Sequence, residues 1–290
     1  MYWSTLKKQE RPTLNAIYSN IGGVRLKPKV SVIMPVYNAE KHLDNSIASV
    51  FNQDYSNIEL IAVNDGSKDN SLEVLHKMAK DKPNFIVLDK PNGGPGDARN
   101  LGLKSATGEY IFFSDSDDTI CKGAISHAVD SIGDCDLLIG KFNMLMGDKV
   151  SERGLIDKEK TLGRDEFLAR YVRYPGSFYY SALWNKLYKR DIIAKNNLSF
   201  NTNIAWGEDF VFNVQYNYYV NNVKIVPFCM YNHIWNISGQ TWTTLHRLPR
   251  NILTKKLMYK ELKALYKYAG KYKEYWLYVT RYIFNVTLLD

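Results

Sequence analysis

The chain has 290 residues, of which 45% are hydrophobic, and it carries a net charge of +8. This is enough apolar material for a substantial core, so a disordered chain is excluded. The first residues lack the apolar core of a signal peptide and no eighteen apolar residues run together, which predicts a cytoplasmic protein without a membrane span. Cys121, Cys135 and Cys229 have neither metal-ligand nor CxxC spacing, so we expect reduced thiols without a role.

The positive charge is concentrated near the C-terminal end of the sequence. Residues 246–290 contain ten Lys or Arg against three acids, a balance of +7, which leaves about +1 for everything before them. A nearly neutral body argues against nucleic acid as the partner. The positive charge therefore bears on what the tail binds and not on what the body does.

Short apolar runs alternate with helical patterns between residues 30 and 140. The runs are VSVIMP, IELIAV, FIVLD, YIFFSD and DLLIG, and their continuous, β-branched character predicts strands covered on both faces. Asn38 is expected to cap a helix after the first strand, Ser67 or Asp69 a helix after the second, and a third helix begins near Pro95. The alternation predicts an α/β fold with a mostly parallel sheet and helices on both faces.

The regular alternation stops after Gly140. A mixed segment reaches about Phe200, a helix is expected from near Gly207, and KIVPF at 224–228 predicts another strand. From about Asn251 apolar residues recur at spacings of four and three, which predicts an amphipathic helical extension. Its apolar stripe consists of Met258, Leu262, Leu265, Ala269, Tyr272, Trp276, Val279 and Ile283.

Polar clusters follow three of the predicted strands. They are PVYN at 35–38, NDGS at 64–67 and SDSDD at 114–118. In doubly wound sheets the ligand crevice lies beyond the carboxyl ends of the strands. We therefore expect these three clusters to face one site.

The third cluster places Asp115, Asp117 and Asp118 directly after an apolar strand. Carboxylates are the ligands that Mg²⁺ and Mn²⁺ prefer, and a substrate phosphate commonly completes the shell. An isolated Asp-x-Asp is more often a solvated turn without an ion. The apolar strand before this one favours a site for a metal and a diphosphate.

Two further segments could contact a nucleotide. Asp65 ends the second strand, where its carboxylate could accept hydrogen bonds from a base or ribose, although an Asp before Gly66 and Ser67 is also typical of a turn and helix cap. The sequence KPNGGPGDARNLG at 90–102 places three glycines before a helix, so backbone NH groups could approach a nucleotide closely. It differs from the dinucleotide fingerprint GxGxxG, which disfavours an NAD enzyme.

In this order and at these intervals, the motifs resemble the nucleotide-sugar-binding half of family 2 glycosyltransferases, which have the GT-A fold. The resemblance covers about residues 30–140. It continues more loosely through WNKLYKR at 184–190 and GEDF at 207–210, which are similar to the acceptor half of bacterial members that build surface polysaccharides. It divides the chain into an N-terminal extension (1–29), a nucleotide-sugar-binding half (30–140), an acceptor-binding and catalytic half (141–245) and a basic aromatic helical tail (246–290).

The resemblance implies a UDP-sugar as donor and Mn²⁺ or Mg²⁺ as cofactor. Asp65 would bind the uracil ring, Asp115 the ribose or donor sugar, and Asp117 the metal, with Asp118 orienting either of them. The other implied donor contacts are Pro35, Tyr37, Asn38, Asn92, Gly93 and Arg99.

The resemblance also implies an inverting transfer of a hexose or N-acetylhexosamine to a glycan or lipid-linked acceptor in cell-surface polysaccharide synthesis. Asp209 would be the catalytic base that removes the proton of the attacking hydroxyl, and Glu208 would support it. The residues alone leave another explanation open, because acidic side chains are also favourable at a helix N-terminus.

Three features have more than one explanation. Lys186, within the basic and aromatic segment WNKLYKR, could hold a donor phosphate or be an ordinary charged end of a helix. His233 lies where some relatives have a metal or diphosphate ligand, although many have a Tyr-Tyr-Arg sequence there. The tail could contact the inner face of the cell membrane, form a homodimer or pack on the enzyme itself.

Two other functions remain as alternatives. A sugar nucleotidyltransferase also uses a Gly-rich loop and paired Asp residues, but that loop usually follows the first strand, where this chain has PVYN. A nucleotide-sugar-binding module without catalysis is disfavoured by the intact Asp-x-Asp and Glu-Asp pairs.

Overall fold

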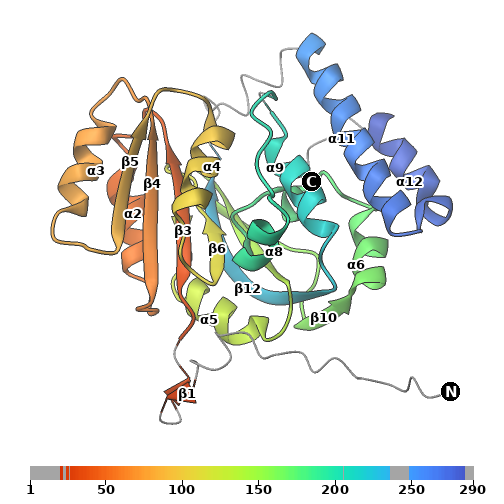
Figure 1. Cartoon of the computed structure of the whole chain (residues 1–290), viewed down its shortest axis with the longest axis horizontal. Coiled ribbons are helices and arrows are strands. Elements are labelled where there is room, and N and C mark those ends of the chain that lie inside the picture. The colour runs from red at the N-terminus through yellow and green to blue at the C-terminus, as the bar shows by residue number, and fades with distance from the viewer. Residues whose placement is uncertain (1–19, 22–23, 26, 205, 236–247, 285–290) are drawn as a thin grey trace, which may run out of the picture.

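The computed structural model describes residues 20–21, 24–25, 27–204, 206–235 and 248–284 (Figure 1). Within the N-terminal extension, β1 (Asn20–Ile21) and β2 (Val24–Arg25) form a small antiparallel pair. The main sheet contains β3 (Val30–Val36), β4 (Ile58–Asp65), β5 (Phe85–Lys90), β6 (Tyr110–Phe113), β7 (Thr119–Ile120), β8 (Leu137–Met146), β9 (Lys149–Arg153), β10 (Lys160–Gly163), β11 (Lys186–Lys189) and β12 (Asn222–Ile234). The helices are α2 (Leu43–Phe51), α3 (Ser71–Ala79), α4 (Pro95–Ser105), α5 (Ala124–Ile132), α6 (Arg164–Tyr171), α7 (Phe178–Ser181), α8 (Arg190–Lys195), α9 (Glu208–Asn217), α11 (Leu248–Tyr268) and α12 (Tyr272–Phe284).

The main sheet is mixed, and its long strands share one direction. The order is β10-β12-β8-β11-β6-β3-β4-β5, with β3 parallel to β4 and β6, β4 parallel to β5, and β8 parallel to β12. The short strand β11 lies antiparallel between β6 and β8. The predicted α/β fold is confirmed, and every apolar run from residue 30 to 140 forms a strand of this sheet.

The central strands are buried because helices cover them. All residues of β4 and all four of β6 are buried. Helix α4 packs on β3 and β4, whereas α2 adjoins α3 and β7 on the other side of the sheet (Figure 1). The carboxyl ends of β3, β4 and β6 therefore open on one edge, where the three polar clusters follow them.

Asn38 does not cap the first helix. Helix α2 begins five residues later, at Leu43, and no side chain caps it. Asn38 has a left-handed backbone (φ 51°), its Oδ1 accepts from the NH of Lys68 at 2.8 Å, and its NH donates to Ser67 Oγ at 3.0 Å. It thus joins the turns after β3 and β4 at the edge where a ligand would sit.

The described part of the tail packs largely on the enzyme itself. Helix α11 lies against α9, and α12 lies against α11. The predicted single stripe is broken at Gly270, whose left-handed backbone (φ 69°) separates the two helices. Met258, Leu262, Leu265 and Val279 are buried as the stripe predicts. Trp276 is 50% exposed instead, and the side chain of Ile283 lies outside the described residues.

Two further findings concern the whole fold. Among the described residues, no helix combines the length and the apolar content needed to cross a membrane. The cysteines are free thiols, as expected, but β7 and β12 bring Cys121 and Cys229 together, with their sulfur atoms 2.7 Å apart. Their spacing in the sequence did not indicate this contact.

Candidate active site

The centre of the site is the buried guanidinium of Arg99, on the second turn of α4. Its Nη1 donates to Asp209 Oδ1 at 2.9 Å and to Glu208 Oε1 at 3.2 Å, and its Nη2 donates to Asp115 Oδ1 at 2.9 Å. One cation thus joins the acidic turn after β6 to the first turn of α9. The sequence predicted each of these four residues, and the structure brings them together.

Close packing of α9 on α4 makes this contact possible. Gly96 lies in the first turn of α4, and a Cβ there would come within 3.2 Å of Phe200 Cβ and 3.6 Å of Glu208 Cγ. The ring of Phe200 also faces the guanidinium of Arg99, 5.6 Å away. A side chain at position 96 would therefore crowd Phe200 first, whereas its Cβ would be in ordinary contact with Glu208.

The cluster contains three carboxylates and one guanidinium, and the pKa of Asp209 is shifted within it. Burial raises the pKa of Asp209 to about 8, and Glu208 and Asp115 act in the same direction against the lowering effect of Arg99. Burial alone would lower the pKa of Arg99, but the three carboxylates raise it, so the guanidinium stays charged. Oδ2 of Asp209 has no hydrogen-bond partner among the described residues and is free to accept a proton.

A second group of side chains lies on the other side of the acidic turn. Asp118 is buried, and its Oδ2 is 2.9 Å from Nδ1 of His233, while its Oδ1 accepts from the NH of Ile234. The imidazole of His233 stacks on Trp184, with the ring centres 5.3 Å apart. A carboxylate on Nδ1 fixes the ring and leaves Nε2 as the free nitrogen, the usual arrangement behind a metal-binding histidine.

Asp117 is the exposed acid of the turn. It lines a cavity of about 330 Å³ together with Asp118, Thr119 and residues of α2. Its pKa is raised to about 7, first by the partial enclosure of the carboxyl and next by Asp118 and Asp115. No three His, Cys, Asp or Glu side chains converge on one metal-sized space in the described ranges. A divalent ion held here would thus need ligand atoms from a bound diphosphate, as Mg²⁺ commonly does.

The predicted nucleotide end of the site is built around Asp65. Its Oδ1 accepts from the NH of Gly93 at 2.9 Å and from Lys90 Nζ at 2.7 Å, and its Oδ2 accepts from the NH of Gly94 at 2.8 Å. Asn92 Nδ2 donates to the Asp65 carbonyl. Asp65 therefore shapes the Gly-rich loop. The side chain of Asp65 is only 3% exposed. Its contact with a uracil ring stays a prediction.

Two of the other predicted donor contacts lie at the same edge of the sheet, and a third points toward α9. Pro35 is the penultimate residue of β3 and is half-buried, and Tyr37 directly follows the strand with an exposed side chain. Arg99, another implied donor contact, binds the carboxylate cluster, and its contact with the donor stays a prediction. It lies one turn into α4, where it points toward α9.

The structure corrects the prediction for Lys186. Its side chain is 1% exposed, and Nζ donates to the carbonyls of Tyr179 and Ala182 and to Asn185 Oδ1. Burial lowers the pKa of this ammonium well below its usual range. WNKLYKR enters β11, between two strands of the sheet, so Lys186 supports the core and does not hold a donor phosphate in this structure.

Two contributors to the site were not predicted from the sequence. Lys90 reaches Asp65, and the parallel register that pairs these two residues at the ends of β5 and β4 would have indicated it. Tyr231 is buried on β12, where its hydroxyl accepts from the NH of Asp115 at 2.8 Å and its ring stacks on Trp184. Nothing in the local sequence distinguishes Tyr231 from the other tyrosines of the chain.

Comparisons with known proteins agree with this fold. Residues 31–196 match the model of the family "Glycosyl transferase family 2". EpsH of Bacillus subtilis is 32% identical over 73% of this chain and 62% of its own length. The poly(ribitol-phosphate) β-N-acetylglucosaminyltransferase TarP of Staphylococcus aureus is 29% identical over 84% of this chain and 78% of its own. The crystal structure of S. aureus TarS 1–349 in complex with UDP-GlcNAc superimposes with a TM-score of 0.69 at 24% identity, over 85% of this chain and 73% of that one.

The chain belongs to glycosyl transferase family 2. It spans less than two thirds of the length of EpsH. The likeness to TarS establishes a GT-A type of fold for the described residues.

Proposed function

We propose that this chain is an inverting, metal-dependent glycosyltransferase that moves a hexose or N-acetylhexosamine from a UDP-sugar to a glycan or lipid-linked acceptor. The observation that carries the proposal is the contact of one buried arginine, Arg99, with Asp115 of the Asp-x-Asp turn and with the Glu208-Asp209 pair. It joins the expected donor end to the expected base. TarP, named as an N-acetylglucosaminyltransferase, and TarS, solved with UDP-GlcNAc, support the donor class.

The chemistry follows from the positions of the acids. An acceptor hydroxyl bound next to Asp209 would give its proton to Oδ2 while the oxygen attacks the anomeric carbon. Arg99 holds the other oxygen of Asp209 and keeps the carboxyl in place. Attack on the face opposite the departing UDP inverts the anomeric configuration. A divalent ion bound at Asp117 would supply positive charge to the departing diphosphate.

Removing the carboxylate of Asp117 tests the metal assignment. We expect Asp117→Ala to weaken UDP binding in the presence of Mn²⁺ by about tenfold to a hundredfold, because this acid is the exposed ligand of the turn. Isothermal titration with and without Mn²⁺ measures the effect. Asp54→Ala, an acid outside the cluster, is the matched control. UDP binding of equal strength with and without metal would contradict the assignment.

The raised pKa of Asp209 predicts a pH dependence. A carboxyl with a pKa of about 8 is protonated at lower pH and cannot act as a base there, so kcat/KM should rise about tenfold per pH unit below 8 and level off above it. A pH profile at saturating metal measures this. A profile that falls as pH rises from 6 to 8 would exclude Asp209 as the base.

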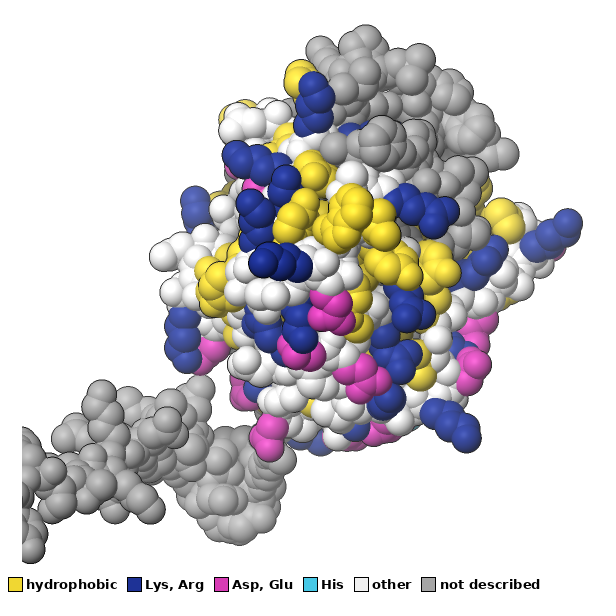
Figure 2. Space-filling view, turned by 90° about the vertical axis from the view of Figure 1, so that its right-hand side faces the viewer, with side chains coloured by type: hydrophobic (Ala, Val, Ile, Leu, Met, Phe, Trp, Pro, Cys, Tyr) yellow, Lys and Arg dark blue, Asp and Glu magenta, His cyan; other side chains and the backbone are white. Residues whose placement is uncertain are grey.

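We also propose that the enzyme works at the inner face of the cell membrane. Figure 2 shows an apolar patch flanked by Lys and Arg on the side of the molecule that carries α11 and α12. Leu277 is 62% exposed, and Trp276 and Tyr278 beside it are exposed as well. Aromatic and apolar side chains flanked by cations suit the headgroup region of an anionic bilayer, although Figure 2 also shows Asp and Glu at the lower edge of the patch.

Replacing the exposed residues of α12 tests this membrane contact without unfolding the tail. The double variant Trp276→Ser, Leu277→Ser should lose sedimentation with vesicles containing phosphatidylglycerol, whereas Tyr174→Ser, an exposed tyrosine outside α11 and α12, should keep it. A truncation before α11 is unsuitable, because it would remove the buried Leu262 and Leu265. Undiminished sedimentation of the double variant would contradict membrane contact. A shift of its gel-filtration volume from dimer to monomer would indicate a homodimer instead.

A further inference from the structure

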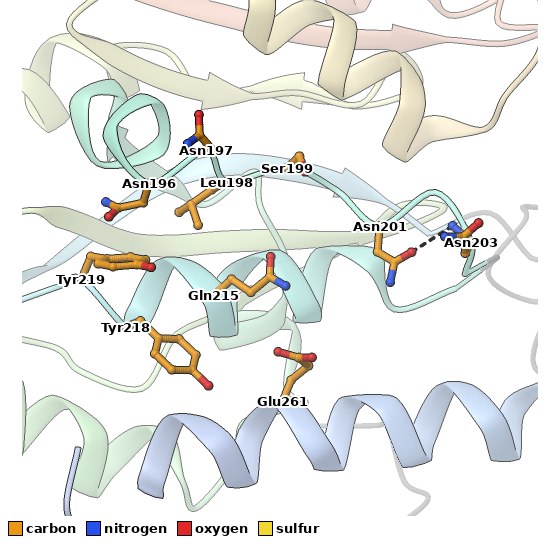
Figure 3. A pocket seen from close by; sticks show the side chains of 10 residues that line it. All are labelled: Asn196, Asn197, Leu198, Ser199, Asn201, Asn203, Gln215, Tyr218, Tyr219 and Glu261. Carbon is orange, nitrogen blue, oxygen red and sulfur yellow. Dashed lines mark hydrogen bonds between the residues drawn. The ribbon is translucent and has the colours of Figure 1, made fainter. Parts of the chain in front are cut away.

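A second concave region lies outside the cluster around Arg99. It has a volume of about 600 Å³, within the range of small-molecule sites. It is bounded by the connection from α8 to α9, by the C-terminal half of α9 and by α11 (Figure 3). We call it the amide pocket, and its lining residues are Asn196, Asn197, Leu198, Ser199, Asn201, Asn203, Gln215, Tyr218, Tyr219 and Glu261.

The lining of the amide pocket suits a neutral ligand with many hydroxyl groups. Side-chain amides both donate and accept hydrogen bonds, as sugar hydroxyls do, and tyrosine offers a flat apolar face together with a hydroxyl. Among the side chains that the structure describes, no Lys or Arg lines the pocket. Helix α11 is rich in lysine, yet the residue it contributes is Glu261. A phosphate would meet a carboxylate and no cation, so the pocket disfavours anionic ligands.

Several polar groups of the pocket have no partner within the described parts of the chain. The side-chain amides of Asn197 and Gln215 and the carboxylate of Glu261 make no hydrogen bond there. Figure 3 shows Glu261 rising from α11 toward Gln215 on α9. The amide of Asn196 instead donates to the Ile192 carbonyl at the end of α8, and Oδ1 of Asn201 accepts from the NH of Asn203 within the loop. The loop is therefore held by one set of amides while another remains available to a ligand.

The pocket and the candidate base share helix α9. This helix begins at Glu208 and Asp209, and Gln215 follows six residues after Asp209, about 9 Å along the helix axis and about 120° around it. The loop that forms the other wall also contacts the site. Phe200, between the lining residues Ser199 and Asn201, packs over Arg99, and Asn100 of α4 holds both its NH and its carbonyl. A chain of sugars with its end at Asp209 could therefore reach this pocket within a few units.

We propose that the amide pocket is a saccharide subsite that binds neutral sugar units of the acceptor chain, a few units away from the attacking hydroxyl. This inference rests on the proposed glycosyltransferase function. Contacts so far from the reacting atoms act equally in the ground state and the transition state, so they lower the KM of long acceptors and leave kcat unchanged. Short acceptors do not reach the pocket and gain nothing from it.

Direct binding of defined oligosaccharides to the full chain tests the proposal. The probes are the hexamers of β-1,4-linked N-acetylglucosamine, β-1,4-linked glucose and α-1,4-linked glucose, with the corresponding monosaccharides and an acidic galacturonate hexamer as comparisons. Saturation-transfer NMR and calorimetry read the binding. We expect at least one neutral hexamer to bind at least tenfold more tightly than its monosaccharide and than the acidic hexamer, in the presence or absence of UDP.

Variants of the pocket locate the binding. Gln215→Leu and Tyr219→Ala should each weaken the neutral hexamer at least fivefold, whereas Tyr174→Ala, a matched exposed tyrosine elsewhere, should not change it. Circular dichroism confirms that each variant is folded. The proposal is overturned if no neutral hexamer binds, if both variants bind it as wild type does, or if the acidic hexamer binds more tightly.

Hydrolysis of UDP-sugars by the same samples separates the two proposals. Pocket variants that hydrolyse a UDP-sugar normally but lose the hexamer support the subsite. A wild-type chain that hydrolyses no UDP-sugar but binds the hexamer through Gln215 and Tyr219 overturns the transferase function and the acceptor role, and leaves a saccharide-binding site.

Discussion

Asp209→Asn is expected to lower kcat by about a hundredfold to ten-thousandfold while leaving the affinity for UDP unchanged. The amide has the same shape as the carboxyl and keeps an oxygen for the contact with Arg99 Nη1, which is 2.9 Å long in the wild type. It cannot accept a proton from the acceptor. The loss therefore falls on turnover and spares donor binding.

Release of UDP from a UDP-sugar measures turnover, and calorimetry measures UDP affinity in the same protein preparation. Asp191→Asn on α8 is the matched control, since this exposed acid pairs with Lys195 and lies outside the carboxylate cluster. Glu208→Gln should have a smaller effect than Asp209→Asn if it has only a supporting role. Near-normal turnover of Asp209→Asn would mean that another residue is the base.

Arg99→Met should have the largest effect on stability. It leaves Asp115, Glu208 and Asp209 together without their cation, and removing one partner of a buried ion pair costs about 3–5 kcal/mol in free energy of unfolding. Two of these carboxylates are more than a quarter exposed, so we expect about 2–3 kcal/mol. Transfer activity should fall with it, because Asp115 and Asp209 lose the group that orients them.

The pH dependence and a second substitution identify the cause of this destabilisation. Without Arg99 the carboxylates are easier to protonate, so Arg99→Met should cost less at pH 5 than at pH 8. Adding Asp209→Asn to Arg99→Met should recover part of the loss in a double-mutant cycle. Arg170→Met, which breaks an exposed pair with Glu166, should cost under about 1 kcal/mol. Urea unfolding gives the free energy of unfolding of each variant. A loss of stability in Arg99→Met no greater than that in Arg170→Met would contradict the account.

The strands and the placement of the motifs could be predicted because they depend on local sequence. Runs such as IELIAV are buried on both faces, and this makes them continuous and apolar. Helix α9 begins where GEDF predicts, after Gly207 with its left-handed backbone (φ 80°). The crevice rule then places Asp65 and Asp115 at one edge of the sheet.

The contacts inside the site depend on pairs that are distant in sequence. Arg99 lies 16 residues from Asp115 and 110 from Asp209, so its partners appear only when α4 and α9 are packed. Lys186 looked like a surface charge because lysine is rarely buried, and only the paths of β11 and α7 supply the carbonyls that accept from it. The apolar stripe of the tail likewise continues in the sequence across Gly270, although the chain changes direction there.

The most direct test of the central claim is a screen of the purified chain against UDP-hexoses and UDP-N-acetylhexosamines with Mn²⁺, followed by release of UDP. We expect at least one UDP-sugar to be consumed, with the reaction lost on addition of EDTA and in Asp209→Asn. When a saccharide acceptor is present, NMR of the product should show an inverted anomeric configuration. Consumption of no UDP-sugar, or formation of a UDP-sugar from UTP and a sugar phosphate instead, would contradict the claim.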